Sequence, residues 1–293
     1  MLITNRFNIP ESFVNFTERD KYDSGDADIS VTSLIDSSRI RKLKKINEDK
    51  IEEDVSDRIM SILGTAVHNI LEVGCPDDAI AERRFFAETK SGKVLSGQVD
   101  LIEKNDDGYT ISDYKVVRGA SISFNPDGKP EWLNQLNCYS WLASQSGINV
   151  TKLQIVAVIR DWSNAAAMRG GSYPKSPVVC LDIKLNSLDE TEKYINEKMD
   201  DHFSDGMRKC TDEERWKGSD THAVYEYSKT GGLKSRAKRL LNSSFEAQAY
   251  MLDNNINGEV VVREAKTTRC DGNYCSVSSW CDQYENEREF WNE

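Results

Sequence analysis

Residues 97–117 read GQVDLIEKNDDGYTISDYKVV, and this stretch decides the fold. It lies within two extended segments, Val94–Glu103 and Tyr109–Val117, that are rich in apolar and β-branched residues. Between them, KNDDG at 104–108 consists of turn-forming residues. The stretch therefore predicts an antiparallel hairpin of two strands.

The predicted hairpin carries acidic and basic side chains that converge. Residues two apart in a strand share a face, so Asp113 and Lys115 project together while Tyr114 points the other way. Asp100 on the preceding strand can reach the same place. Two adjacent carboxylates repel unless a divalent cation such as Mg²⁺ or Mn²⁺ lies between them. Lys115 then suits positioning or deprotonating an attacking water and countering charge on a phosphate, which predicts phosphodiester hydrolysis.

A D-x-K tripeptide is common by chance, so the elements around the hairpin matter. Apolar residues recur at three and four after Val55, and His68 lies beside that stripe. Residues 153–159, LQIVAVI, suit a strand buried on both faces. The predicted elements are, in order, a helix from Val55, a strand at Ala81–Glu88, the hairpin, a helix at Glu131–Gly147, strands at 153–159 and 177–185, and a helix at Asp189–Phe203.

Composition excludes several classes of protein. The chain has 293 residues, of which 38% are hydrophobic, enough for one sizeable core. No run of about 18 apolar residues exists, and the first residues lack a secretory signal, so we expect no membrane span and a cytoplasmic location. The net charge of -11 argues against non-specific coating of nucleic acid, which depends on neutralising phosphates. It does not exclude a nuclease, because local grooves can still gather cations.

The motifs and their order resemble a known family. GTAVHNILE, AERRFFAE, GQVDLIE, ISDYKVV and QLNCY, between residues 61 and 145, look like the successive motifs of RecB-like PD-(D/E)XK nucleases. The resemblance implies an α/β fold with a restriction-endonuclease-like α-β-β-β-α-β core, in which helices flank a mixed central sheet. Members include bacterial recombination nucleases, the nuclease of CRISPR spacer acquisition, a mitochondrial single-strand exonuclease and phage exonucleases.

The resemblance also implies roles for individual residues. Lys115 would be the catalytic lysine, and the Q-x-x-x-Y element would hold the active site and the DNA strand. Either Glu82 or Glu88 would supply a further acidic group, and the sequence leaves that choice open. The implied ligands of Mg²⁺ or Mn²⁺ are His68, Asp100, Asp113 and the carbonyl of Tyr114, and the Q-x-x-x-Y residues are Gln135 and Tyr139.

Seven cysteines without an export signal favour metal binding or burial over disulfides. Cys75, Cys138 and Cys180 lie among apolar residues and are expected to be buried thiols. Four others make a complete set for an iron–sulfur cluster or zinc, and the resemblance favours the cluster because several RecB-like nucleases bind one through one upstream and three C-terminal cysteines. Cys75 is the alternative first ligand. The four are Cys210, Cys270, Cys275 and Cys281.

A basic run lies in the C-terminal region and suits contacts with DNA phosphates. A solvated helix face is the alternative. Trp132, Trp141 and Trp162 could stack on bases, although we expect at least two of them in the core. The residues of the basic run expected to bind DNA are Lys234, Arg236, Lys238 and Arg239.

Three regions follow from these patterns: an N-terminal helical segment at 1–55, the nuclease core at 56–204, and a basic, cysteine-containing extension at 205–293. The sequence predicts a metal-dependent deoxyribonuclease, acting from DNA ends in phage or bacterial recombination, replication or repair. A recombination or replication protein is a candidate partner. The alternative function is an inactive nuclease-fold module that binds DNA ends or a protein.

Overall fold

The structure, a computed structural model, describes residues 2–19 and 25–292. The chain divides into two compact units, Met1–Arg208 and Lys209–Glu293. None of the helices in the described ranges has the length and apolar content needed to cross a bilayer. The division into an N-terminal segment at 1–55, a nuclease core at 56–204 and an extension at 205–293 stays a prediction.

Unit 1 is built around a mixed six-stranded sheet in the order β2-β5-β6-β7-β8, with β4 paired to β5 on its other side. β5 runs antiparallel to β4 and β6, β6 is parallel to β7, and β7 is antiparallel to β8. The α/β fold with a mixed central sheet flanked by helices is thus confirmed. The strands are β2 (Ile29–Ser30), β4 (Ile80–Glu88), β5 (Val94–Asn105), β6 (Gly108–Val117), β7 (Val150–Ile159) and β8 (Val178–Ile183), beside a small pair of β1 (Leu2–Thr4) and β3 (Glu52–Asp54).

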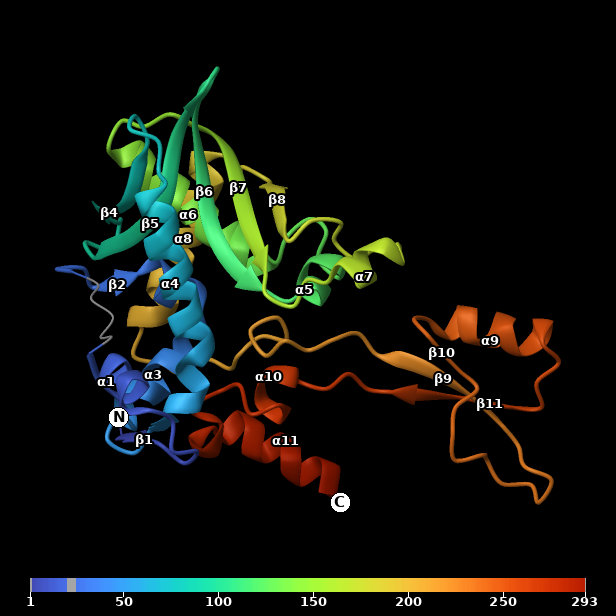
Figure 1. Ribbon diagram of the computed structural model, residues 1–293. Coiled ribbons are helices and arrows are strands. Elements are labelled where there is room, and N and C mark those ends of the chain that lie inside the picture. Colours follow the sequence, from blue (N-terminus) through green and yellow to red (C-terminus); the bar gives the residue numbers. More distant parts are fainter. Residues whose placement is uncertain (1, 20–24, 293) are drawn as a thin grey trace. The chain divides into compact units, whose positions relative to one another are not determined.

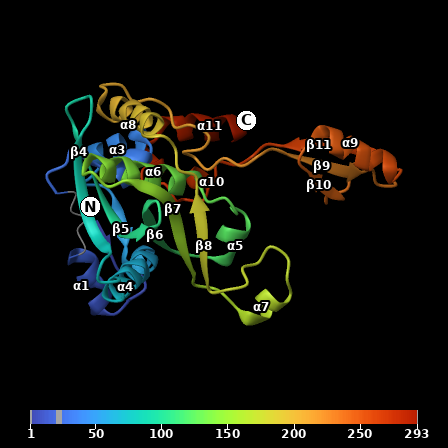
Figure 2. The same cartoon turned by 90° about the horizontal axis from the view of Figure 1, so that it is seen from above.

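Helices cover both faces of the sheet, with α6 and α8 on one side and α4 with α1 on the other (Figures 1 and 2). The main core lies under α6, where Leu136, Leu142 and Ile155 are fully buried. The helices of unit 1 are α1 (Glu11–Arg19), α2 (Val31–Ile35), α3 (Ser38–Ile46), η1 (Val55–Arg58), α4 (Ile59–Val73), α5 (Gly119–Ser123), α6 (Pro130–Gln145), α7 (Asn164–Met168) and α8 (Leu188–Phe203).

The predicted burial of residues 153–159 on both faces was wrong, and the predicted helix after Val55 forms but is less covered than its apolar stripe suggests. The predicted helix after Val55 forms as α4, but none of its residues is buried, and Ile70 is 70% exposed. In β7 only alternate residues are buried, so the strand is not equally covered on both faces. Both differences have one cause: α6 seals one face of the sheet, whereas α4 lies more loosely over the other.

The N-terminal segment joins the main core rather than standing apart from it. Ile29, Val31 and Leu34 pack in the central hydrophobic cluster. The charged helix α3 is also more than a solvated face, because Arg39 is buried and Lys42 donates to the carbonyls of Asp201 and Ser204 at the end of α8. Cations there satisfy the unpaired carbonyls of a helix C-terminus.

Unit 2 holds a three-stranded sheet in the order β10-β9-β11, with α9 packed on one face through Val224 and Ala247. The chain then returns through a region rich in cysteine. The elements of unit 2 are β9 (Thr221–Glu226), β10 (Arg239–Leu241), α9 (Ser244–Asp253), β11 (Gly258–Arg263), α10 (Thr268–Asp271), η2 (Ser278–Trp280) and α11 (Asp282–Asn292).

Candidate active site

The site begins where two neighbouring strands separate. β5 and β6 pair as far as Leu101 and Ser112, after which β6 continues beside β7 alone. Asp100 is the next residue of β5, and its Oδ2 accepts a hydrogen bond of 2.7 Å from the backbone N–H of Tyr114. The side chain thereby takes the place of the missing strand partner. Strand separation is what opens the sheet at the carboxylates.

His68 of α4 lies over this opening. Its Nδ1 is 3.4 Å from Oε1 of Glu82 and 3.5 Å from Oδ1 of Asp100, while its Nε2 is 3.2 Å from the carbonyl oxygen of Tyr114. The imidazole also meets the Tyr114 ring edge-on, with 5.9 Å between centroids. His68, Glu82 and Asp100 each offer a ligand atom, and these three atoms lie within 4.8 Å of one another.

Asp113 and Lys115 form the second half of the site. Asp113 is 1% exposed, and its Oδ2, which is buried and lacks a hydrogen bond of good geometry, lies 2.6 Å from Nζ of Lys115. This contact requires both side chains to lie on the same face of β6, as predicted. The Lys115 ammonium partly compensates the charge of this buried carboxylate, which could also bind a divalent cation.

The charges of the site are strongly coupled. Burial, followed by the negative charge of Asp113, raises the pKa of Asp100 to about 7. The hydrogen bond with Glu82 is the main reason that the pKa of His68 is raised. For Glu82, burial favours the neutral form, but hydrogen bonds with His68 and Gln98 outweigh it and lower the pKa. A positive ion between these groups would relieve the repulsion between the Asp100 and Asp113 carboxylates.

The donor set fits an oxygen-preferring divalent ion. It comprises carboxylates, a backbone carbonyl and one imidazole, which suit Mg²⁺ or Mn²⁺ better than a thiophilic metal. The residues that would hold such an ion include His68, Glu82 and Asp100.

The structure separates the two acidic candidates of β4. Glu82 lies with His68, whereas Glu88 is exposed at the far end of the strand, opposite Val94. Sequence analysis did not single out Gln98, whose Nε2 donates to Oε2 of Glu82 over 2.7 Å. Its position two residues before Asp100, on the same face of the strand, was the available signal.

The Q-x-x-x-Y residues lie one turn apart on α6, where Nε2 of Gln135 donates to the hydroxyl of Tyr139 over 2.8 Å. Tyr139 packs directly on β5: a Cβ added to Gly97 would lie 2.8 Å from its ring. Glycine is therefore required for this close approach of helix and strand. The role of both residues at the metal and the DNA stays a prediction.

The four predicted metal-binding cysteines gather in unit 2. Burial raises the pKa of Cys270 to about 11, and the neighbouring thiols of Cys275, Cys210 and Cys281 add to that effect. Among the described residues, no three of these sulfurs form a group as compact as His68, Glu82 and Asp100.

Of the other three cysteines, only Cys138 is buried. The prediction was wrong for Cys180, which is exposed because it lies on the same face of β8 as Val178 and Asp182, and that face is open to solvent. Cys75 is half-buried in unit 1, with Glu103, Glu72 and Asp78 as its charged neighbours.

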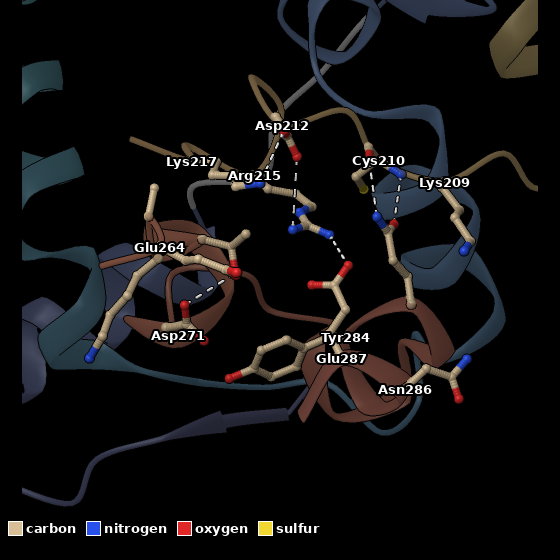
Figure 3. Close-up of a pocket in the computed structure, with 14 residues that line it drawn as sticks. Lys209, Cys210, Asp212, Arg215, Lys217, Glu264, Asp271, Tyr284, Asn286 and Glu287 are labelled. Atoms are coloured by element: carbon tan, nitrogen blue, oxygen red, sulfur yellow. Dashed lines mark hydrogen bonds and ion pairs between the residues drawn. The ribbon is translucent and has the colours of Figure 1, made fainter. Parts of the chain in front are cut away.

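A pocket of about 890 Å³ lies beside Cys210, and all the residues that line it belong to unit 2 (Figure 3). At its wall Nη1 of Arg215 lies 2.5 Å from Glu287, and Nη2 lies 4.0 Å from Asp212. Four cations and four anions line the pocket, so it has no net charge that would select an ionic ligand. The cluster of His68, Glu82 and Asp100 lies in unit 1 and shares no residue with the lining of this pocket.

The basic run is an exposed loop leading into β10 rather than a helix. Two of its four cations are ion-paired, since Nζ of Lys234 is 2.6 Å and that of Lys238 3.8 Å from Glu226. Trp132 and Trp141 are buried, as expected, which leaves only the half-buried Trp162 among the three for stacking.

Comparison with known proteins identifies the family. The model of the PD-(D/E)XK nuclease superfamily matches residues 77–282. Nine chains among the solved structures are similar, and one of them, the crystal structure of SSO0001, aligns with 19% identity over 64% of this chain and 84% of its own, with a TM-score of 0.45. No curated protein matches.

Proposed function

This chain belongs to the PD-(D/E)XK nuclease superfamily, and we propose that it is a RecB-like, metal-dependent DNA nuclease that acts from DNA ends. The observation that carries the proposal is the convergence of His68, Glu82 and Asp100 at the separation of β5 and β6, next to the Lys115–Asp113 pair. Recombination, replication or repair of phage or bacterial DNA is the proposed setting.

The residues of the site would divide into metal ligands and a lysine that acts at the phosphate. His68, Glu82, Asp100, Asp113 and the Tyr114 carbonyl would hold Mg²⁺ or Mn²⁺, which supplies an acidified water and neutralises charge on the scissile phosphate. The Lys115 ammonium is held by Asp113 at 2.6 Å and cannot itself ligate a metal. It is placed to hydrogen-bond the attacking water and to stabilise the negative charge that develops on the phosphate oxygens.

The proposal is tested with end-labelled single- and double-stranded DNA incubated with Mg²⁺ or Mn²⁺. We expect cleavage that a chelator stops and either ion restores. Asp113→Ala and Lys115→Ala should each lower the rate by about 100-fold or more without loss of fold, because both act at the reacting phosphate. Cleavage that is insensitive to chelation, or near-normal activity in either variant, would contradict the assignment.

We also propose that Cys210, Cys270, Cys275 and Cys281 bind one metal centre, an iron–sulfur cluster or alternatively zinc. Their common location in unit 2 supports this, because a bound cation would relieve the repulsion between neighbouring thiolates. Iron and zinc analysis of anaerobically purified protein distinguishes the two. Finding neither iron nor zinc would contradict the proposal that these cysteines bind a metal centre.

In the basic run, Arg236 and Arg239 are proposed to contact DNA phosphates, with a smaller contribution from Lys234 and Lys238 because of their pairing with Glu226.

A further inference from the structure

Positive charge without acidic partners lies at the ends of β6 and β7. Arg118 directly follows β6 and Arg160 directly follows β7. These strands are parallel, with Val117 opposite Ile159, and the backbone N–H of Arg160 donates to the carbonyl of Val117 over 2.9 Å. Both arginine side chains are exposed, and neither forms an ion pair in the described part of the chain. These two arginines therefore contribute positive charge at neighbouring strand ends in a protein of net charge -11.

The loop after β7 adds two further exposed cations, Arg169 and Lys175, which likewise have no ion pair among the described residues. This loop and α5 lie together beyond the ends of the strands (Figure 1). Asp161, the acidic residue nearest in sequence to Arg160, is already engaged, because its Oδ1 accepts the N–H of Gly119 over 2.7 Å. The loop therefore presents cations while its carboxylate is turned to the backbone.

Hydrogen bonds and packing hold the loop against α5. The Tyr173 hydroxyl accepts from the N–H of Ser163 and donates to a backbone carbonyl, and Oγ of Ser123 donates to the carbonyl of Ser172 over 2.9 Å. A Cβ added to Gly119 would lie 2.7 Å from the Tyr173 ring, so the two segments touch. The backbone that carries these cations is therefore held by packing, so less backbone conformational entropy is lost when the cations bind a ligand.

These cations lie within a few nucleotides of the candidate metal site. Arg118 is three residues beyond Lys115, about 10 Å along the strand. The Arg160 guanidinium contacts the sulfur of Met60 on α4, and Met60 precedes His68 by two turns, about 12 Å along the helix. In double-stranded DNA one strand rises about 3.4 Å per nucleotide, so offsets of this size correspond to phosphates about three or four nucleotides from the scissile one.

We propose that Arg118 and Arg160, supported by Arg169 and Lys175, bind the phosphates of the nucleic-acid strand whose scissile bond lies at His68 and Asp100. The proposal rests on the proposed function for the identity of the strand. Arginine suits this role because its planar guanidinium can donate two parallel hydrogen bonds to one phosphate.

The test is a salt titration of binding. The double variant Arg118→Gln/Arg160→Gln is compared with Lys152→Gln/Lys193→Gln, which removes the same charge from unit 1 at lysines paired with Asp182 and Glu197. Binding of a fluorescent single-stranded oligonucleotide is measured by anisotropy without divalent ions, so that cleavage does not intervene. Circular dichroism confirms that both variants are folded.

We expect the arginine double variant to bind more weakly and the slope of log K against log salt to fall by about 1.4, since each single-strand phosphate contact contributes about 0.7. The lysine control should keep the wild-type slope. Equal slopes in both variants, or a wild type that does not bind the oligonucleotide, would overturn the proposal.

Cleavage does not contribute to the measured binding, so the nuclease function and the phosphate-binding role of Arg118 and Arg160 are tested separately. A reduced slope in a protein that never cleaves DNA would remove the nuclease function and keep the phosphate surface. An unchanged slope in an active nuclease would remove only the surface.

Discussion

Glu82 has a backbone φ of 47°, in the left-handed region that non-glycine residues occupy at a cost of about 1 kcal/mol or more. This conformation occurs in the middle of β4, between Ala81 and Arg83, which keep their pairing with β5. The carboxylate is meanwhile held by His68 and by Gln98. Strain at a residue that points into the candidate metal site indicates that its direction matters for function.

Gln98 helps to hold the Glu82 carboxylate toward the candidate metal site. Its amide nitrogen donates to Glu82, and its Oε1 accepts a hydrogen bond of 2.9 Å from Nη2 of Arg84. Gln98→Leu removes the donor, and we expect Mn²⁺ affinity, measured by calorimetry, to fall about 10-fold or more, as is typical when a metal ligand loses its hydrogen-bond partner. Gln154→Leu, in β7 of the same sheet, is the control. Equal Mn²⁺ affinity in wild type and Gln98→Leu would show that Gln98 has no positioning role.

His202 of α8 gives the protein a pH-dependent stability. It is 2% exposed, its Nε2 donates to the carbonyl of Leu34 over 3.0 Å, and its Nδ1 makes no hydrogen bond of good geometry within the described residues. Burial, with smaller contributions from Arg41 and Lys198, lowers its pKa despite the raising effect of nearby carbonyls. As the pH falls below about 6.5, His202 therefore takes up a proton in the unfolded chain before it does so in the folded protein.

Because the folded pKa is lowered, the free energy of unfolding is unaffected above about pH 6.5 and falls as the pH drops below it. Urea unfolding at several pH values should show this loss in the wild type and a smaller loss in His202→Gln, which keeps a donor for Leu34. Identical pH profiles for the two proteins would mean that His202 does not cause the loss.

At the scale of elements, α11 connects the end of the chain to the segment that carries Cys210. Gln283 and Glu287 lie four residues apart on one face of the helix. Gln283 accepts the N–H of Cys210 over 2.7 Å and donates to its carbonyl over 3.0 Å, while Glu287 pairs with Arg215. The helix therefore holds the upstream cysteine beside the three C-terminal ones.

Gln283→Leu should release this segment. The partly buried N–H and carbonyl of Cys210 lose their partners, which costs at most about 1–3 kcal/mol. We expect a lower melting temperature, and faster reaction of Cys210 with a thiol reagent in metal-free protein. Asn286→Leu, at an exposed position of the same helix, is the matched control. Wild-type reactivity of Cys210 in Gln283→Leu would exclude the helix as its support.

At the scale of the whole molecule, the two units should respond differently to divalent ions. Two compact units need not unfold in a single transition. Mn²⁺ at about 100 times its dissociation constant should stabilise unit 1 by about 2.7 kcal/mol, because binding is linked to folding. Scanning calorimetry after dialysis against a chelator, with and without added Mn²⁺, measures the shift. The shift should vanish in Asp100→Asn, and its persistence there would place the ion elsewhere.

The sequence by itself determined the order of the main elements between Val55 and Phe203 and the shared direction of Asp113 and Lys115. Both follow from local periodicity, since side chains repeat every two residues in a strand and every 3.6 in a helix. The short turn at 104–108 likewise fixed Asp100 on a neighbouring strand. These properties need no knowledge of distant segments.

Only the tertiary structure decided between Glu82 and Glu88, added Gln98 to the site and placed Cys210 with the C-terminal cysteines. It also left α4 uncovered and separated the paired cations of the basic run from the unpaired ones after β6 and β7. Each of these depends on which residues far apart in the chain come into contact. Strand register, strand separation and ion pairing set those contacts, and none of them is encoded in the spacing of residues along one segment.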